Sequence, residues 1–249
     1  MDKKLIYLFL LVLLCSCAER VYDEDSHSSD SQGNLTFSFD SVTNPAVWST
    51  FNSLEEMQAA CQIPESTLKK MTTDQLLSAC MHYPLYGNYI AYNNEMDGIN
   101  AIITHFNGFS ELSKRPDAAE KILTLYEKVD VDKVNDNIAS RPSQENISFL
   151  RLGYLELIIA SKNFPSLYEK KYASRLATAV NTNIAKEAMH PEKFCILNIR
   201  KPMLVGAQIK LSDKSVSNAD IIVLHDFVRS GGNVAKNEIY TKVSPIIAE

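Results

Sequence analysis

Apolar side chains recur at helical spacing along most of the chain, beginning at Trp48. Ser53 and Glu56 form a capping-box pair, and Met57 and Cys61 follow on one helical face. The pattern predicts an all-α protein, an irregular array or orthogonal bundle of about 8–10 helices without a regular repeat. Further helix starts are expected near Pro64, Thr72, Asn94, Arg115, Pro142 and Ser217, and the longest amphipathic run is 167–189.

Three segments depart from this helical pattern. Residues 35–39 alternate apolar and polar side chains, which is typical of a short edge strand or an extended lead-in. Residues 194–199 and 203–211 are apolar and rich in β-branched side chains, so each could be a strand or a short buried helix. A helix from Ala219 to Val228 is expected to stop at Gly231-Gly232, and the tail, 233–249, to be loosely attached.

The N-terminus has the pattern of an export signal. A short basic segment precedes an apolar run at 5–14, which is too short to span a bilayer. Leu14-Cys15-Ser16-Cys17 then resembles the lipobox of bacterial lipoproteins, although Cys15 is an unusual residue at its position. The resemblance implies cleavage after Ser16 by signal peptidase II, a lipid on Cys17, and anchoring in the cell envelope, at the outer membrane. The membrane, through this lipid, is the first expected partner.

A tether is expected between the anchor and the helices. Residues 17–46 are acidic and rich in Ser and Asp, and they contain too little apolar surface to fold alone. Their acidic cluster, 23–25, resembles the surface-export signal of Bacteroidetes-type lipoproteins, but the sequence leaves the membrane face open. The expected division is a signal peptide (1–16), a flexible tether (17–46), an N-terminal helical module (47–130), a C-terminal helical region (131–232) and the tail.

Composition and motifs exclude several function classes. The net charge is −5 and basic residues form no block, which argues against a nucleic-acid partner. The sequence has no HExxH, no two histidines at the spacing of one helical turn, no P-loop and no GxGxxG motif. We therefore expect no metal, no cofactor and no catalytic residues.

The segment 78–94 has the strongest binding signature. It holds four of the eleven tyrosines, at a spacing of three, and ends in two asparagines. In an α-helix this spacing drifts around the axis, so some rings must pack inward. We expect Tyr83 and Tyr86 to be core or turn residues. The residues expected to border a groove for a sugar or a peptide are Tyr89, Tyr92, Asn93 and Asn94.

The cysteines of the folded part leave alternatives open. Cys61 and Cys80 could form a disulfide in an exported protein, or could pack as buried thiols. A cysteine nucleophile beside His82 or His190 is a further alternative, but no flanking motif of a thiol protease supports it.

Part of the chain resembles a known family. Segments such as 60–65, 71–76, 83–85 and 106–109 are similar to a family of exported helical proteins of Bacteroidetes-type bacteria, and the resemblance covers 48–129. It implies a shared helical module, with no activity attached.

The sequence therefore favours a lipid-anchored envelope protein that acts as a non-catalytic binding or assembly module for a peptide, a protein or a glycan. One alternative is an envelope hydrolase acting on glycan or peptide, with two perturbed titratable groups in one cleft. Another is a structural lipoprotein that braces a larger complex through an exposed apolar patch.

Overall fold

The computed structural model describes residues 27–29, 35–134, 147–213 and 215–248. Its fold is all-α, as predicted, apart from a short antiparallel ribbon in which β1 (His27–Ser29) pairs with β2 (Leu35–Phe37). The longer helices are α4 (Leu54–Ala60), α6 (Thr73–Met81), α7 (Glu95–His105), α9 (Ala118–Glu127), α10 (Phe149–Ala160), α11 (Lys170–Met189), α12 (Ile196–Ser212) and α13 (Asn218–Arg229). The shorter ones are α2 (Asp40–Thr43), α3 (Pro45–Trp48), α5 (Glu65–Leu68), α8 (Asn107–Leu112), α14 (Lys236–Glu238) and α15 (Ser244–Ala248).

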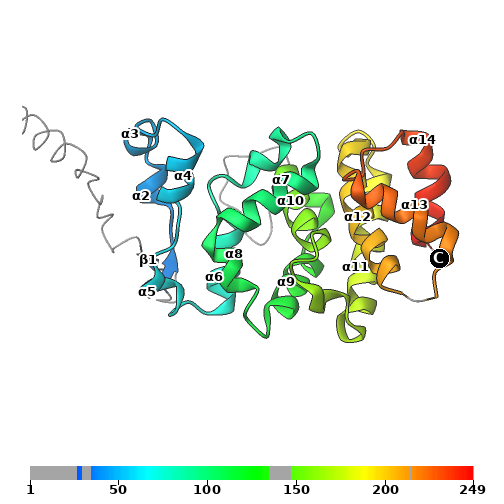
Figure 1. Ribbon diagram of the computed structural model, residues 1–249, viewed down its shortest axis with the longest axis horizontal. Helices are drawn as coiled ribbons and strands as arrows, with labels where there is room; N and C mark the ends of the chain where they lie inside the picture. The colour runs from blue at the N-terminus through cyan, green and yellow to red at the C-terminus, as the bar shows by residue number, and fades with distance from the viewer. Residues whose placement is uncertain (1–26, 30–34, 135–146, 214, 249) are drawn as a thin grey trace, which may run out of the picture.

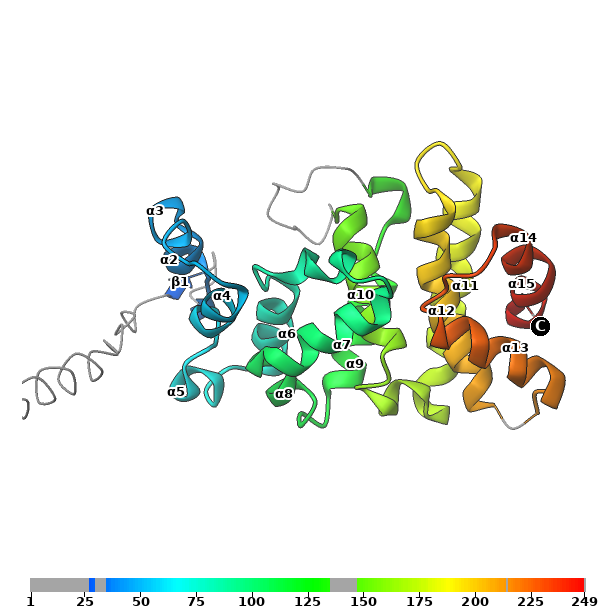
Figure 2. The ribbon, with the colours of Figure 1, turned by 45° about the horizontal axis from the view of Figure 1, so that its top comes forward.

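The helices follow one another along the longest axis of the molecule (Figure 1). The short helices α2 to α5 lie at one end, α6 to α10 form the middle, and α11 to α15 form the other end. The turned view shows the same order (Figure 2). Short 3₁₀ segments connect longer helices: η1 (Tyr86–Ala91), η2 (Val131–Lys133) and η3 (Pro165–Tyr168). The π-helical turn η4 (Ile239–Val243) joins α14 to α15.

Buried apolar side chains from Phe39 to Ile247 form one continuous core. The division expected at residues 130 and 131 does not interrupt this core, because α9 packs against α11 and α7 packs against α10. In addition, Tyr126 of α9 donates a hydrogen bond of 3.0 Å to Glu156 of α10. The two helical regions are therefore parts of one packed body.

Residues 194–211, whose structure the sequence left open, contain a single helix. α12 continues through Pro202, and its middle turns are buried among α10, α11 and α13. A helix that is covered on several sides needs apolar residues all around, and this removes the periodicity that would identify it. α10 approaches α12 closely at Gly153, where an added Cβ would lie 2.7 Å from Cδ of Lys201.

Two segments that the sequence predicted to be flexible or loosely attached contain folded parts. The tail was expected to be loosely attached, but Ile239, Val243 and Ile247 are buried, and Ile247 packs against Gly206 of α12. These apolar residues recur every four residues, which is a helical pattern that the sequence reading missed. Part of the expected tether is also folded: Phe39 is buried, and its ring centroid lies 6.0 Å from that of Phe106.

The expected signal peptide, Cys17 and the acidic cluster lie outside the described residues. The predicted helix start at Pro142 also lies outside them, and the described helix α10 begins at Phe149 behind the capping residue Ser148.

Several predicted helix ends are confirmed. Thr72 and Gln75 form the full capping box of α6, and the side chain of Ser217 caps α13. After α13, Gly231 and Gly232 take φ values of 64° and 74°, and their amides donate to carbonyl oxygens of the last turn. This is a Schellman motif, which glycine forms without steric cost.

Candidate functional site

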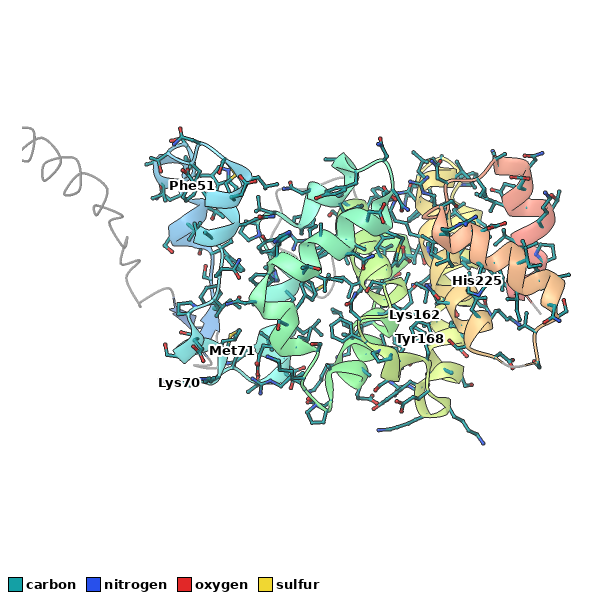
Figure 3. All side chains as sticks on the ribbon, viewed as in Figure 1. Phe51, Lys70, Met71, Lys162, Tyr168 and His225 are labelled. Atoms are coloured by element: carbon teal, nitrogen blue, oxygen red, sulfur yellow. The ribbon has the colours of Figure 1, made fainter. Side chains whose placement is uncertain are left out.

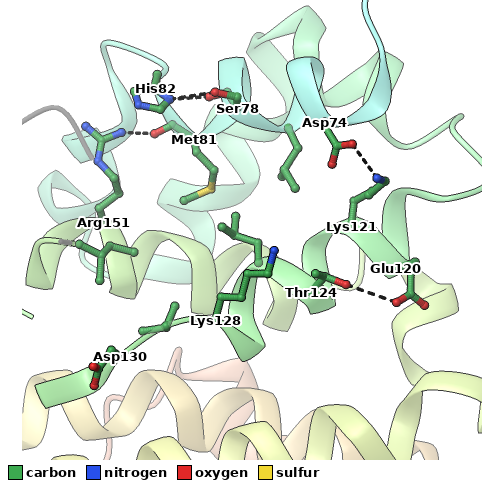
Figure 4. Close-up of a pocket in the computed structure, with 14 residues that line it drawn as sticks. Asp74, Ser78, Met81, His82, Glu120, Lys121, Thr124, Lys128, Asp130 and Arg151 are labelled. Atoms are coloured by element: carbon green, nitrogen blue, oxygen red, sulfur yellow. Dashed lines mark hydrogen bonds and ion pairs between the residues drawn. The ribbon is translucent and has the colours of Figure 1, made fainter. Parts of the chain in front are cut away.

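A cleft of about 550 Å³ lies between α6 and α9 and is closed at one end by the start of α10 (Figure 4). This volume is within the range of small-ligand sites in proteins. The residues lining it are Asp74, Leu77, Ser78, Met81, His82, Glu120, Lys121, Thr124, Leu125, Lys128, Val129, Asp130, Ile147 and Arg151.

Helical geometry explains which side chains line the cleft. On α6 the lining positions are 74, 77, 78 and 81, on α9 they are 120, 121, 124 and 125, and the C-cap residue 128 continues the same face. Residues three or four apart share a helical face, so each wall is one continuous face of a helix. Both walls are therefore held by backbone hydrogen bonds rather than by loops.

Local hydrogen bonds fix two polar residues at the closed end. Nδ1 of His82 lies 2.7 Å from the carbonyl oxygen of Ser78, one turn earlier in α6. Arg151 donates to the carbonyl oxygen of Met81, and its guanidinium lies 4.2 Å above the ring of Tyr86. Burial lowers the pKa of Arg151 from its usual value.

Each carboxylate that lines the cleft already has a cationic partner. Asp74 pairs with Lys121 across the cleft at 2.6 Å and raises the pKa of this lysine. Glu120 pairs with Arg175 of α11 at 2.8 Å, and this hydrogen bond lowers the pKa of Glu120.

The third carboxylate, Asp130, lies 3.4 Å from Lys133 and 3.9 Å from Lys186. By contrast, Lys128 has no carboxylate partner within the described parts of the chain, and it extends into the space between the two helices (Figure 4).

The four predicted ligand-binding residues do not form one groove. Tyr89 is 1% exposed, and its hydroxyl donates to the carbonyl oxygen of Leu150 at 3.0 Å. Asn94 caps α7 through Met96. Only Tyr92 and Asn93 are exposed.

The backbone conformation explains why Tyr89 is buried. η1 is a 3₁₀ helix with three residues per turn, so Tyr86 and Tyr89 lie on one face instead of drifting apart as in an α-helix. Both rings pack near Tyr154, with centroid distances of 5.6 and 6.3 Å. Tyr83 and Tyr86 are core residues, as the sequence reading expected.

The three cysteines of the described chain are free thiols, and Cys61 and Cys80 are buried. Burial raises the pKa of Cys61 to about 12. His82 lines the cleft, whereas His190 lies 3.0 Å from Asp132 and 3.2 Å from Glu192 at the surface.

Two carboxyl groups with raised pKa values lie in the core and not in the cleft. Glu156 and Glu187, on α10 and α11, are each 1% exposed. Burial raises the pKa of Glu187 to about 8 and that of Glu156 well above its usual value, and the charge of Glu187 raises the pKa of Glu156 further. Lys201 opposes both shifts, while its ammonium group donates to the carbonyl oxygen of Leu197 at 2.8 Å and lies 3.4 Å from Glu95.

Comparison with known protein families, with curated proteins and with solved structures finds no match in any of the three. The site must therefore be interpreted from its own geometry. Over the described ranges, no group of His, Cys, Asp and Glu side chains is arranged to hold a metal ion. The same part of the chain has no helix with the length and hydropathy that crossing a bilayer requires.

Sequence reasoning did not find the cleft. Its walls come from two helices, of which the first ends at Met81 and the second begins at Ala118, and no local motif predicts the distance between them. One signal was present: on α9, polar residues such as Thr124 and Lys128 recur every four positions beside a mainly apolar face. This pattern is also typical of an ordinary exposed helix.

Proposed function

We propose that the protein is a binding module whose ligand site is the cleft between α6 and α9. The observation that carries this proposal is a cleft of about 550 Å³ that combines aliphatic side chains with Lys128, which has no carboxylate partner among the residues that the structure describes. Ligand sites in proteins are typically concave and mainly apolar, with a few polar groups that fix orientation. Five of the fourteen described lining residues of the cleft are aliphatic, and the other nine supply polar or charged groups.

The position of the walls supports binding without large rearrangement. α6 and α9 belong to the continuous core, and Arg175 of α11 fixes the outer face of α9 by pairing with both Glu120 and Glu127. Sites built on packed helices hold their geometry better than sites on loops. The ligand therefore meets a preformed surface.

We place this binding module in the cell envelope, attached through a lipid on Cys17. Support comes from the lipobox-like segment Leu14-Cys15-Ser16-Cys17 and the short apolar run that precedes it. An exported binding module on a membrane anchor would take up or present its ligand at the membrane surface.

Filling the cleft tests the binding site. Thr124 lines the cleft from α9, and a Thr124→Phe substitution would place an aromatic ring in the cavity. Thr178→Phe on the exposed face of α11 is a matched control, because both threonine hydroxyls bond to a group one turn earlier. A library of small acids, sugars and short peptides would be screened by ligand-observed NMR against wild type and both variants.

We expect compounds that bind the wild type and Thr178→Phe but not Thr124→Phe. Circular dichroism would confirm that both variants stay folded. If every bound compound binds Thr124→Phe equally well, or if none binds the wild type, the cleft is not a ligand site and the proposal fails.

A further inference from the structure

We infer that the cleft takes an apolar acid, a ligand with one carboxylate on an apolar body, and that Lys128 binds this carboxylate. The inference rests on the proposed function, because it assigns a ligand class to the same cleft. Three features of the described residues lead to it: the charge balance of the lining, the apolar walls and the placement of the lysine.

The charged side chains that line the cleft favour an anionic ligand. The three carboxylates of the lining are each paired with a cation, and some of those cations, such as Arg175 and Lys186, come from outside the cleft. These pairs leave Lys128 and Arg151 without a carboxylate partner in the part of the chain that the structure describes. A cationic ligand would be repelled by both groups, whereas an anionic one would neutralise them.

The arrangement of the two cations favours a single carboxylate over a phosphate. Arg151 is held against Met81 and Tyr86, so part of its donor set is already committed. Lys128 is the flexible cation of the pair, with three donors on a long side chain. Phosphate sites usually combine several donors, often with a glycine-rich backbone loop, and neither wall of this cleft has such a loop.

The aliphatic side chains of the walls favour a ligand with an apolar body. The described lining includes five aliphatic side chains, three from α6 and α9 and two from the segments that follow α9 and precede α10: Leu77, Met81, Leu125, Val129 and Ile147. A fully hydrophilic ligand such as a small sugar acid would leave this surface in contact with water. A hydrocarbon chain or an aliphatic side chain of the ligand would cover this surface, and removing both apolar surfaces from water would contribute to the free energy of binding.

The position of Lys128 makes it available to the ligand. It is the residue that ends α9, and its backbone amide donates to carbonyl oxygens of the last turn. Its side chain is exposed and extends into the space between α6 and α9 (Figure 4). A carboxylate bound there would lie at the rim, with its apolar body between α6 and α9.

Two sources supply this chemistry, a free fatty acid and the C-terminal residue of a peptide. The test therefore compares ligands of equal size that differ in charge: octanoate, octanol and octylamine, together with N-acetyl-Leu-Leu as the free acid and as the amide. Dissociation constants would be measured by NMR titration with wild type, Lys128→Gln and Lys128→Arg. The matched control is Lys70→Gln, because Lys70 is an exposed lysine outside the cleft at the edge of the N-terminal part (Figure 3).

We expect at least one of the two acids to bind more tightly than its uncharged analogue, and octylamine to bind most weakly. Lys128→Gln should weaken binding of that acid about tenfold, the usual loss for a charge-assisted hydrogen bond, and Lys128→Arg should retain it. Lys70→Gln should have no effect. The acid that binds identifies the source.

The inference fails if neither acid binds more tightly than its neutral analogue, or if Lys128→Gln binds the acid as well as the wild type does. In either case, compounds that bind the wild type but not Thr124→Phe would still establish the cleft as a ligand site. Failure of the ligand class is therefore distinguishable from failure of the proposed function.

Discussion

Replacing Glu187 with glutamine should reduce the pH dependence of stability between about pH 5 and pH 8. In the folded protein burial raises the pKa of Glu187 to about 8, whereas its usual value is 4.5. Between these values the folded state retains a proton that the unfolded state has released. The contribution of Glu187 to the free energy of unfolding must therefore fall as pH rises through this window and level off above pH 8.

The magnitude follows from the width of the window. One carboxyl group that is protonated only in the folded state changes the free energy of unfolding by up to about 1.4 kcal/mol per pH unit. Over the window of Glu187 the upper limit is about 5 kcal/mol, which is a large share of the stability of an ordinary domain. Glu156 adds to the slope in the wild type, and its pKa should fall when the charge of Glu187 is removed.

The assay is urea unfolding followed by far-UV circular dichroism at pH 5, 6, 7 and 8. Glu65→Gln is the matched control, because Glu65 is exposed and its hydrogen bond to Lys69 lowers its pKa. It therefore titrates below the window, and its loss should leave the slope unchanged. If Glu187→Gln loses stability with pH as steeply as the wild type does, the buried carboxyl is not protonated in the folded state and the reasoning is wrong.

Three further predictions follow from contacts described above. Gly153→Ala should destabilise the protein by about 1–3 kcal/mol in urea unfolding, because the new methyl group overlaps the side chain of Lys201; a neutral result would mean that the lysine moves aside. Tyr89→Ala should cost about 3–5 kcal/mol and Tyr92→Ala less than about 1, and equal losses would contradict the burial of one ring and the exposure of the other. Cys17→Ser should move the protein from the membrane fraction to the soluble fraction after cell fractionation, and a variant that stays in the membrane fraction would contradict the lipid anchor.

Sequence patterns predicted the features of the fold that depend on neighbouring residues. The capping box at Thr72 and the glycine stop after α13 are local, because each is completed within one helical turn. The same locality made the all-α class predictable. It failed at Tyr89, because the sequence pattern was interpreted with α-helical geometry, whereas the segment forms a 3₁₀ helix in which a spacing of three keeps the rings on one face.

Features of the fold that depend on residues far apart in the chain could not be predicted from sequence patterns. α12 has no readable period, since it is packed against α10, α11, α13 and α15. The cleft depends on how far apart α6 and α9 lie, and on pairs such as Asp74 with Lys121 that join residues far apart in the chain. That Lys128 has no carboxylate partner among the described residues could be recognised only from the structure, which shows the partners of the other charged side chains.

The amide of Asn94 has a consequence for the order of folding. Its oxygen accepts from Met96 at the start of α7, while its nitrogen donates to the carbonyl oxygen of Arg229 at the end of α13. The first bond forms within one turn, but the second closes a loop of 135 residues and cannot form until α13 has been synthesised. A chain interrupted before α13 would thus retain the cap of α7 but lack the bond that joins this helix to the opposite end of the molecule.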